Sequence, residues 1–486
     1  PYDNVSPFHE DNVSENDAAE AARSKGIGFA LPRRRPAWVL WVIAFIVSIL
    51  VAFQCAGMLF LEKELAVLKF KLVWLVHKHS PALALLIFVT YGLTAALISA
   101  LLVLYVSPRA ASSGIPDMKA FLNGNFIPGF LSRKTWFART LGLVLSTSAG
   151  LFSGSEGPLL AHLGAIVASG VARGRFTIAG RRIRFPWKLT GFRHQCEFVS
   201  FGAAVGVAGA FGSPVGGVLW GFEEASSYWP AELTWRTFAG CAVCTVLAKA
   251  TKAGFQSMPT TSFIEFPDVK ADFSPWELLP FAVLGVVCGL FGACFCLGSR
   301  ALGRWRQKVF TKAKPRLRVR IAEVLAMALF ILLACSVTTF LWGCSPLVDG
   351  SDAGDERYYA GNMVQAHCPD GHYTDLGTLL LQPKHAAIKA LFTQQFRGGA
   401  HFHPFPLLFT YFLVFACTLG STGMAMPFGV FVPHMFAGSC LGRCMGMLVQ
   451  YCFPDAGVHL GVYALVGAAG QLSGIVRMTV SLTMIL

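Results

Sequence analysis

Charged residues are scarce in this sequence: Asp, Glu, Lys and Arg make up only 14% of its 486 residues, whereas apolar residues make up 54%. Soluble domains carry roughly a quarter charged residues. A soluble chain of this length would also need an extensive polar surface, because the ratio of surface to volume limits how much of a fold can be buried. The composition therefore excludes an ordinary soluble protein and indicates that lipid covers much of the surface.

The motifs of common hydrolases are also absent. The sequence contains neither an HExxH nor a GxSxG motif, and its apolar segments hold no paired aspartates. Cys241 and Cys244 form a CxxC pair in an apolar run, but no second pair or nearby His accompanies them. We therefore expect a protein that is not an enzyme and that has neither a cofactor nor a bound metal.

Long apolar segments predict an all-α polytopic membrane protein. Ala37–Leu61 and Pro81–Ser107 contain no charged residue, and at ~1.5 Å per residue each is long enough to cross the ~30 Å hydrocarbon core. Many later apolar segments are short and interrupted by Gly, Pro or Ser, a pattern tolerated only beside protein or a watery cavity and typical of a transport site. These shorter segments include Leu141–Gly154, Gly157–Val171, Phe198–Phe211, Val215–Phe222, Leu407–Leu419 and Val430–Leu441.

The net charge of +14 is concentrated in a few connecting segments. Arg173–Arg193 and Arg304–Arg320 are basic, whereas Ser345–Thr378 is acidic. Cytoplasmic loops are enriched in Lys and Arg, so we expect the basic loops and the N-terminus to be cytoplasmic and the acidic loop to be luminal or extracellular. No nucleic-acid partner is expected. Cys344 and Cys368 flank the acidic loop, on the side where a disulfide can form.

Two regions are predicted along the chain. Residues 1–35 are polar and are interpreted as a largely disordered cytoplasmic arm, and residues 36–486 as one transmembrane transport domain. Because the sequence begins without Met and stops at Leu486 inside an apolar run, we expect it to be part of a longer protein.

Three segments share one design: Ser112–Pro116, Gly154–Pro158 and Gly429–Pro433 each place glycine before a proline at the start of an apolar helix. Such a start leaves backbone N–H groups without partners at the positive end of the helix dipole, where they bind an anion without a full positive charge. The alternative for each is an ordinary N-cap or turn. The Ser113 hydroxyl and the edge of the Phe431 ring are candidate anion contacts, with capping and core packing as their alternatives.

Glu156 is the leading candidate for a gate. A carboxylate in an apolar setting costs ~2.5 kcal/mol or more at the bilayer centre, so it is functional by default. Its charge can occupy the anion's own site, and protonation would release it; the alternative is a carboxylate that caps the helix. Glu223 and Glu224 end another apolar run and point ~100° apart on a helix. One is expected to satisfy nearby backbone and the other to relay protons, unless both are solvated.

Together these residues resemble the CLC family of chloride channels and chloride/proton exchangers. Ser112–Pro116 is similar to its GSGIP motif, Gly154–Pro158 to its G(K/R)EGP motif and Gly429–Pro433 to its GxFxP motif, and Gly212–Glu224 is similar to the stretch that ends in the family's proton glutamate. The resemblance implies a fold of two inverted repeats with tilted and broken helices, and a homodimer with one pore per subunit. It also implies Glu156 as the gating glutamate, Glu224 as the proton glutamate, and a chloride site formed by Ser113, Gly114, Ile115, Gly157, Val430 and Phe431.

The resemblance favours voltage- or pH-gated chloride transport by chloride/proton antiport, because channel members usually replace the residue matching Glu224 with an apolar one. A passive gated chloride channel on the same fold is the alternative. Leu233–Arg236 and the loop around Cys368 are most similar to the late-endosomal and lysosomal branch, which implies an endosomal, lysosomal or vacuolar membrane. Chloride and protons are the expected partners, besides the lipid bilayer; an accessory subunit stays open.

The sequence departs from the family pattern at two positions. Ser112 stands where the family usually has Gly, and Ser155 stands where it usually has Lys or Arg before Glu156. The second change removes a positive charge beside the expected pathway. The family's chloride-binding tyrosine and its cystathionine-β-synthase-type domains are expected beyond Leu486.

Overall fold

The structure is a computed structural model, which describes most of the chain after residue 36. The predicted arm, residues 1–35, lies outside the described residues and stays a prediction. The described residues are 37–77, 80–125, 127–154, 158–178, 181–184, 187, 189, 191–256, 274–312, 316–346, 364–369, 372–392, 402–454 and 457–485.

Helices form nearly all of the first half of the described chain. A long apolar helix, α2 (Ala37–His77), is followed by α3 (Pro81–Leu101), whose last turn widens into the π-helix η1 (Leu102–Val106). The short 3-10 helix η2 (Pro108–Ala110) then leads into the region of the first glycine–proline motif. The remaining elements are α4 (Ile115–Leu122), α5 (Arg133–Ser148), α6 (Pro158–Ala172), β1 (Arg175–Ile178), β2 (Arg181–Arg184), α7 (Phe192–Phe211), α8 (Pro214–Trp220), the π-helix η3 (Gly221–Ala225) and α9 (Ala231–Gln256).

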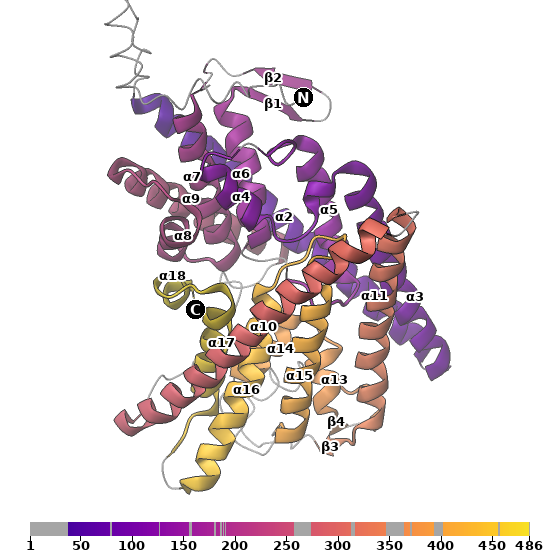
Figure 1. The fold of residues 1–486 in the computed structure, drawn as a ribbon. Coiled ribbons are helices and arrows are strands. Elements are labelled where there is room, and N and C mark those ends of the chain that lie inside the picture. The colour runs from indigo at the N-terminus through magenta and orange to yellow at the C-terminus, as the bar shows by residue number, and fades with distance from the viewer. Residues whose placement is uncertain are drawn as a thin grey trace, which may run out of the picture.

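The second half is built in a similar way. The 3-10 helix η4 (Pro275–Glu277) opens the long helix α10 (Leu278–Lys312), and α11 (Arg316–Leu341) follows. Figure 1 shows the first half mainly in the upper part of the molecule and α10 to α18 mainly below it. The remaining elements are β3 (Ser345–Pro346), β4 (His372–Tyr373), α13 (Asp375–Leu380), α14 (Lys384–Phe392), α15 (Pro404–Ser421), α16 (Phe431–Cys452), α17 (Leu460–Val476) and α18 (Val480–Ile485).

Tight helix pairs are formed twice, by α6 with α7 and by α16 with α17. A Cβ on Gly202 would lie 2.4 Å from the Gly164 carbonyl oxygen across the first pair. Across the second pair, a Cβ on Gly442 would lie 2.1 Å from the Tyr463 carbonyl oxygen. Only glycine allows the backbones to approach so closely, as is common between membrane helices. The same packing in both halves agrees with the predicted internal repeat.

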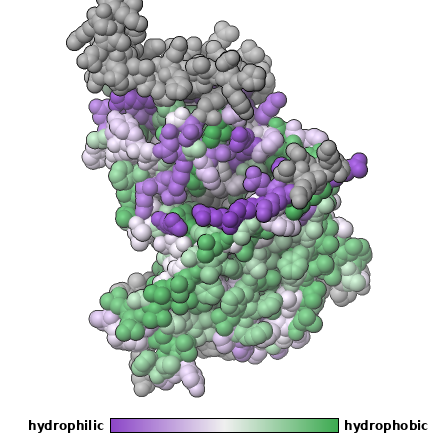
Figure 2. All heavy atoms as spheres, in the orientation of Figure 1, coloured by the Kyte–Doolittle hydropathy of each residue, from purple (hydrophilic) through white to green (hydrophobic). Residues whose placement is uncertain are grey.

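The membrane character of the chain is confirmed by helix length and composition. Five helical segments of the described chain are long and apolar enough to cross a bilayer. Hydrophobic residues cover the lower part of the face in Figure 2. The five segments are Ala37–Val76, Ala82–Val106, Pro275–Phe310, Leu317–Leu341 and Pro404–Ser421.

Two basic segments are more ordered than the loops that the sequence predicted. The first contains the antiparallel hairpin of β1 and β2, with Arg175 opposite Arg184. Most of the second, Arg304–Arg320, is helical, because Arg, Lys and Gln are good helix formers and α10 extends to Lys312. Arg306 within it is buried and binds Glu323 and the carbonyl groups of Gly420 and Thr422.

The chain from Leu460 to Ile485 forms two helices. Arg477 has φ of +63° and ends α17, after which α18 begins at Val480. The short strands β3 and β4 pair beside the disulfide between Cys344 and Cys368, which confirms the bridge suggested by their position around the acidic loop.

Candidate anion-binding site

Backbone hydrogen bonds tie together the three glycine- and proline-containing segments, although they lie far apart in sequence. The Ser112 amide donates to the Met426 carbonyl at 3.1 Å, and the Gly154 amide donates to the Gly429 carbonyl at 3.2 Å. The Gly429 amide in turn donates to the Ser153 hydroxyl oxygen at 3.4 Å. These bonds hold the described segments before α4, α6 and α16 next to one another.

The starts of α4 and α16 are not capped by a side chain of their own cap residue. Gly114 precedes α4 with φ of +79°, and Val430 precedes α16 with helical backbone angles; neither makes a side-chain cap. The first N–H groups of a helix have no acceptor within the helix. These groups carry the positive end of the helix dipole and suit a small anion. Ile115 and Phe431 are both buried at these starts, where their side chains are part of the hydrophobic core.

Arg139 of α5 is a buried cation directly behind the Ser113 segment. Its Nη1 atom donates to the Ser113 carbonyl at 2.5 Å, and its Nη2 atom donates to the carbonyls of Arg109 and Ala111 at 2.9 and 3.2 Å. Arg139 thus fixes the loop before α4 and adds positive charge near it without entering the site. The sequence analysis missed this residue, which is the one charged residue of α5 beyond Arg133 and Lys134 at the start of the helix.

His162 of α6 completes the support behind Gly114. Its ring stacks on Phe130 with centroids 4.4 Å apart, and its Nε2 atom lies 3.2 Å from the Phe130 carbonyl oxygen. A Cβ on Gly114 would lie 2.6 Å from the His162 Nδ1 atom and 2.5 Å from the Arg139 Nη1 atom. The position therefore requires glycine for both its backbone angle and its lack of a side chain.

Ser112 adopts the left-handed backbone conformation, with φ of +61°. Glycine reaches this region freely, whereas other L-residues pay roughly 1–2 kcal/mol to do so. The departure from the family motif at this position is therefore accommodated by backbone strain, and the hydrogen bond that the Ser112 amide donates to the Met426 carbonyl holds the residue in place.

Glu156 and Gly157, together with the neighbouring Ser155, lie outside the described residues. The assignments of Glu156 as the gate and of Gly157 as a chloride contact therefore stay predictions. The described residues on either side place the expected position between Gly154, which pairs with Gly429, and Pro158, where α6 begins.

Glu223 and Glu224 lie in the π-helix η3 and point to different partners. The Glu223 carboxylate accepts hydrogen bonds from the amides and hydroxyls of Thr479 and Ser481, at 2.6 to 2.9 Å. It therefore anchors the start of α18. The Glu224 carboxylate instead forms an ion pair with Lys119 of α4, with Nζ and Oε1 2.7 Å apart.

Glu224 is the more enclosed partner of this ion pair. Its side chain is 12% exposed, whereas that of Lys119 is 41% exposed. Burial raises the pKa of the Glu224 carboxyl, and the hydrogen bond and charge of Lys119 oppose that rise. Such a group can hold a proton at the rim of the protein and release it again.

These features define a polytopic helical membrane protein in which backbone hydrogen bonds tie together the segments that precede three of its helices. The family model described as voltage gated chloride channel matches residues 95–486. The chain belongs to this family, the CLC family of chloride channels and transporters.

Curated relatives match most of the chain. It is 32% identical over 468 residues to the human H(+)/Cl(-) exchange transporter 7, across 92% of this chain and 55% of that protein. It is 33% identical over 410 residues to chloride channel protein C of Dictyostelium discoideum, across 83% of this chain and 53% of that protein. The chain thus spans about half the length of these relatives.

Solved structures support the same fold of two inverted repeats. A eukaryotic CLC transporter superposes with a TM-score of 0.65 and 23% identity, covering 92% of this chain and 66% of that chain. A slow cyanobacterial Cl-/H+ antiporter superposes with a TM-score of 0.67 and 19% identity, covering 91% of this chain and 87% of that chain. At these identities the likeness establishes the fold alone.

Proposed function

We propose that the protein exchanges chloride for protons across a membrane, through a pathway in each subunit of a homodimer. One observation carries the proposal: the segments before the three helix starts are tied together by backbone hydrogen bonds. The Ser112 amide donates to the Met426 carbonyl, and the Gly154 amide donates to the Gly429 carbonyl. Backbone N–H groups bind an anion firmly enough to select it and weakly enough to release it.

Proton coupling is supported by the placement of Glu224. It lies apart from the three helix starts in sequence, is mostly enclosed, and is linked to α4 through Lys119. Since α4 begins at the proposed chloride site, the ion pair joins the proton-accepting group to an element that holds the anion. Glu156 is proposed as the gate between them, on the basis of its motif. The relative named as an H(+)/Cl(-) exchange transporter also supports the proposal of proton-coupled transport.

A passive, gated chloride channel on the same fold is the second candidate. The Glu224–Lys119 pair also fits a purely structural ion pair at the rim of the molecule. One relative is named a chloride channel protein, and this name favours the second candidate.

The two candidates predict different responses to a proton gradient. With equal chloride on both sides of a reconstituted bilayer, an exchanger develops a nonzero reversal potential when a pH gradient is imposed, because its charge movement includes protons. The reversal potential of a passive chloride channel stays at zero. We expect the full-length protein to give a shift that grows with the pH difference; a value independent of pH would refute exchange.

Replacing Lys119 by Met is expected to move the pH dependence of proton transport to higher pH. Lys119 stabilises the ionised carboxylate, so its loss raises the pKa of the Glu224 carboxyl further. The protonated form then persists to higher pH. Proton flux from proteoliposomes across a pH series measures the shift. Lys134→Met is the control, because Lys134 is exposed at the start of α5; an unshifted profile in Lys119→Met would contradict the proposal.

The compartment and orientation are part of the proposal. The disulfide between Cys344 and Cys368 supports a luminal or extracellular acidic loop, because disulfides persist in oxidising compartments. The basic segments and the N-terminus are then cytoplasmic. Together with the resemblance of Leu233–Arg236 to the late-endosomal and lysosomal branch, this favours an acidic intracellular membrane.

A further inference from the structure

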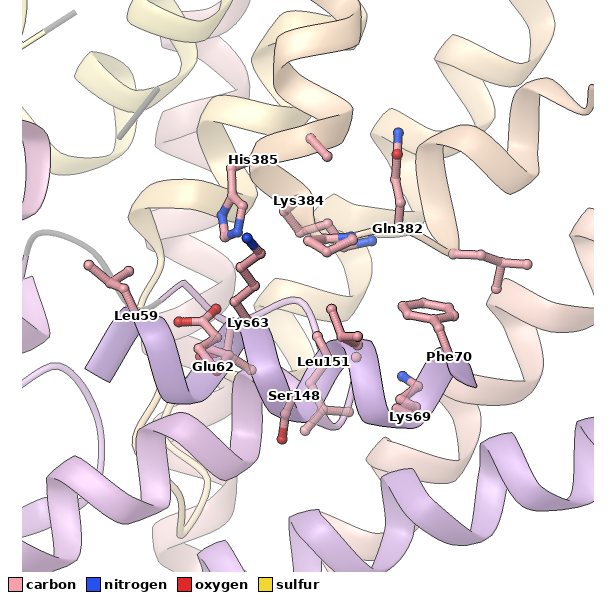
Figure 3. A pocket seen from close by; sticks show the side chains of 18 of the residues that line it. Leu59, Glu62, Lys63, Lys69, Phe70, Ser148, Leu151, Gln382, Lys384 and His385 are labelled. Carbon is pink, nitrogen blue, oxygen red and sulfur yellow. The ribbon is translucent and has the colours of Figure 1, made fainter. Parts of the chain in front are cut away.

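A cavity of about 710 Å³ lies between α2 and the segment that joins α13 to α14. Figure 3 shows Lys63 and Lys69 on α2, with Gln382, Lys384 and His385 on the opposite wall. Its walls are mostly apolar, yet two of its lysines, Lys69 and Lys384, are buried. Buried cations need a reason, because removing an ammonium group from water is costly unless a counter-charge replaces the water.

The cavity adjoins the site described above. Ser153 and Gly154, which pair with the segment before α16, line it, and so does Val432 in the first turn of α16. These residues directly flank the second and third helix starts. The cavity is therefore continuous with the surroundings of the proposed chloride site and is not a separate surface feature.

Among the described residues, the partners of the Lys69 ammonium group are neutral. It is 2% exposed, and its Nζ atom donates to the Ala149 carbonyl at 3.1 Å. The same atom lies 4.1 Å from the centroid of the Phe88 ring. A carbonyl and an aromatic face stabilise an ammonium group in part, but they carry no full negative charge.

Lys384 repeats this arrangement at the start of α14. It is 8% exposed, its Nζ atom donates to the Leu380 carbonyl at 3.0 Å, and it lies 4.7 Å from the centroid of the Phe152 ring. Lys69 and Lys384 line the same cavity. Within the part of the chain that the structure describes, neither ammonium group forms an ion pair.

We propose that Lys69 and Lys384 bind a small inorganic anion, a halide or nitrate, in this cavity at the entrance to the pathway. Two buried like charges beside a cavity are mutually stabilised when one anion lies between them. The anion class follows from the position next to the second and third helix starts. The use of this anion in transport rests on the proposed function, but its binding does not.

Bromide soaked into crystals of the full-length protein tests the binding directly, because its anomalous scattering locates the ion. We expect a bromide peak within ~3.5 Å of both ammonium nitrogens, the contact distance of a charge-assisted hydrogen bond to a large anion. The double variant Lys69→Met, Lys384→Met should lose this peak and keep any peak at the helix starts. Lys63→Met is the matched control: Lys63 lies on the same helix and lines the same cavity, but is exposed, so the peak should remain.

Chloride flux from proteoliposomes provides a second measurement on the same variants. The double variant should require roughly fivefold more chloride for half-maximal flux, since two partly screened charges near the pathway are lost, whereas Lys63→Met should change little. No bromide at the lysines while bromide occupies the helix starts would overturn the proposal, as would acyl-chain density in the cavity. If bromide binds at the lysines but the protein shows no proton-coupled flux, the anion site is supported and chloride/proton exchange is refuted. The experiment therefore distinguishes failure of the anion site from failure of the proposed function.

Discussion

Replacing Glu224 by alanine is expected to reduce proton transport to the background of protein-free liposomes, while chloride flux continues. The change removes the enclosed carboxylate that pairs with Lys119 and leaves the bonds among the three helix starts intact. Chloride and proton fluxes are to be recorded from the same proteoliposomes with a chloride electrode and a pH electrode. Proton flux at the wild-type ratio to chloride would show that Glu224 has no part in the relay.

The neighbouring carboxylate provides the control for this experiment. Glu223 accepts hydrogen bonds from Thr479 and Ser481, so Glu223→Gln is expected to loosen α18 and lower thermal stability without uncoupling the two ions. If Glu224→Ala and Glu223→Gln uncouple proton from chloride transport equally, a change in the structure of η3 causes the effect, and proton binding by Glu224 does not.

A second large effect is expected from Gly114→Ala. The new methyl group would have to share space with the Arg139 guanidinium and the His162 ring, at 2.5 and 2.6 Å, in a backbone conformation that costs roughly 1–2 kcal/mol for L-residues. The start of α4 must shift, and the backbone N–H groups that we propose to contact the anion move with it. We expect chloride flux to fall by roughly 10-fold, because a lost hydrogen bond to a charged group costs about 1.5–3 kcal/mol.

Gly124→Ala separates the backbone effect from the steric one. Gly124 follows α4 with φ of +87°, and a Cβ there would meet nothing within 4 Å. The two variants share the backbone strain, but only Gly114→Ala adds the steric clash, so only Gly114→Ala should lose transport. Equal flux in both would mean that the packing behind Gly114 does not position the site.

The helix starts were predictable because their signals are local. The proline and glycine residues around Gly114, Gly154 and Val430 indicate where a helix begins, and this signal does not depend on contacts with the rest of the fold. The ends of long helices were less predictable. The first apolar run was predicted to end at Leu61, but α2 continues to His77, because Glu, Lys and Leu favour a helix as strongly as purely apolar residues do.

Contacts between side chains and elements distant in sequence were not predictable. Arg139 and Lys384 contact carbonyl groups or aromatic rings from other elements, and no spacing in the sequence encodes these partners. The different roles of Glu223 and Glu224 were partly anticipated from their angular separation on a helix. Which of them would anchor the backbone became clear only because α18 lies against α8 and η3, where Thr479 and Ser481 meet Glu223.

The disulfide between Cys344 and Cys368 would keep the protein covalently joined after a single proteolytic cut in the loop that it closes. It closes a ring of chain that begins just after α11 and ends just before β4. If a protease of an acidic compartment cut the backbone once inside that ring, the two pieces would still be covalently joined, and α11 and α13 would stay tethered at the same place. A nicked molecule would therefore migrate as one chain on a denaturing gel without reductant and as two with it.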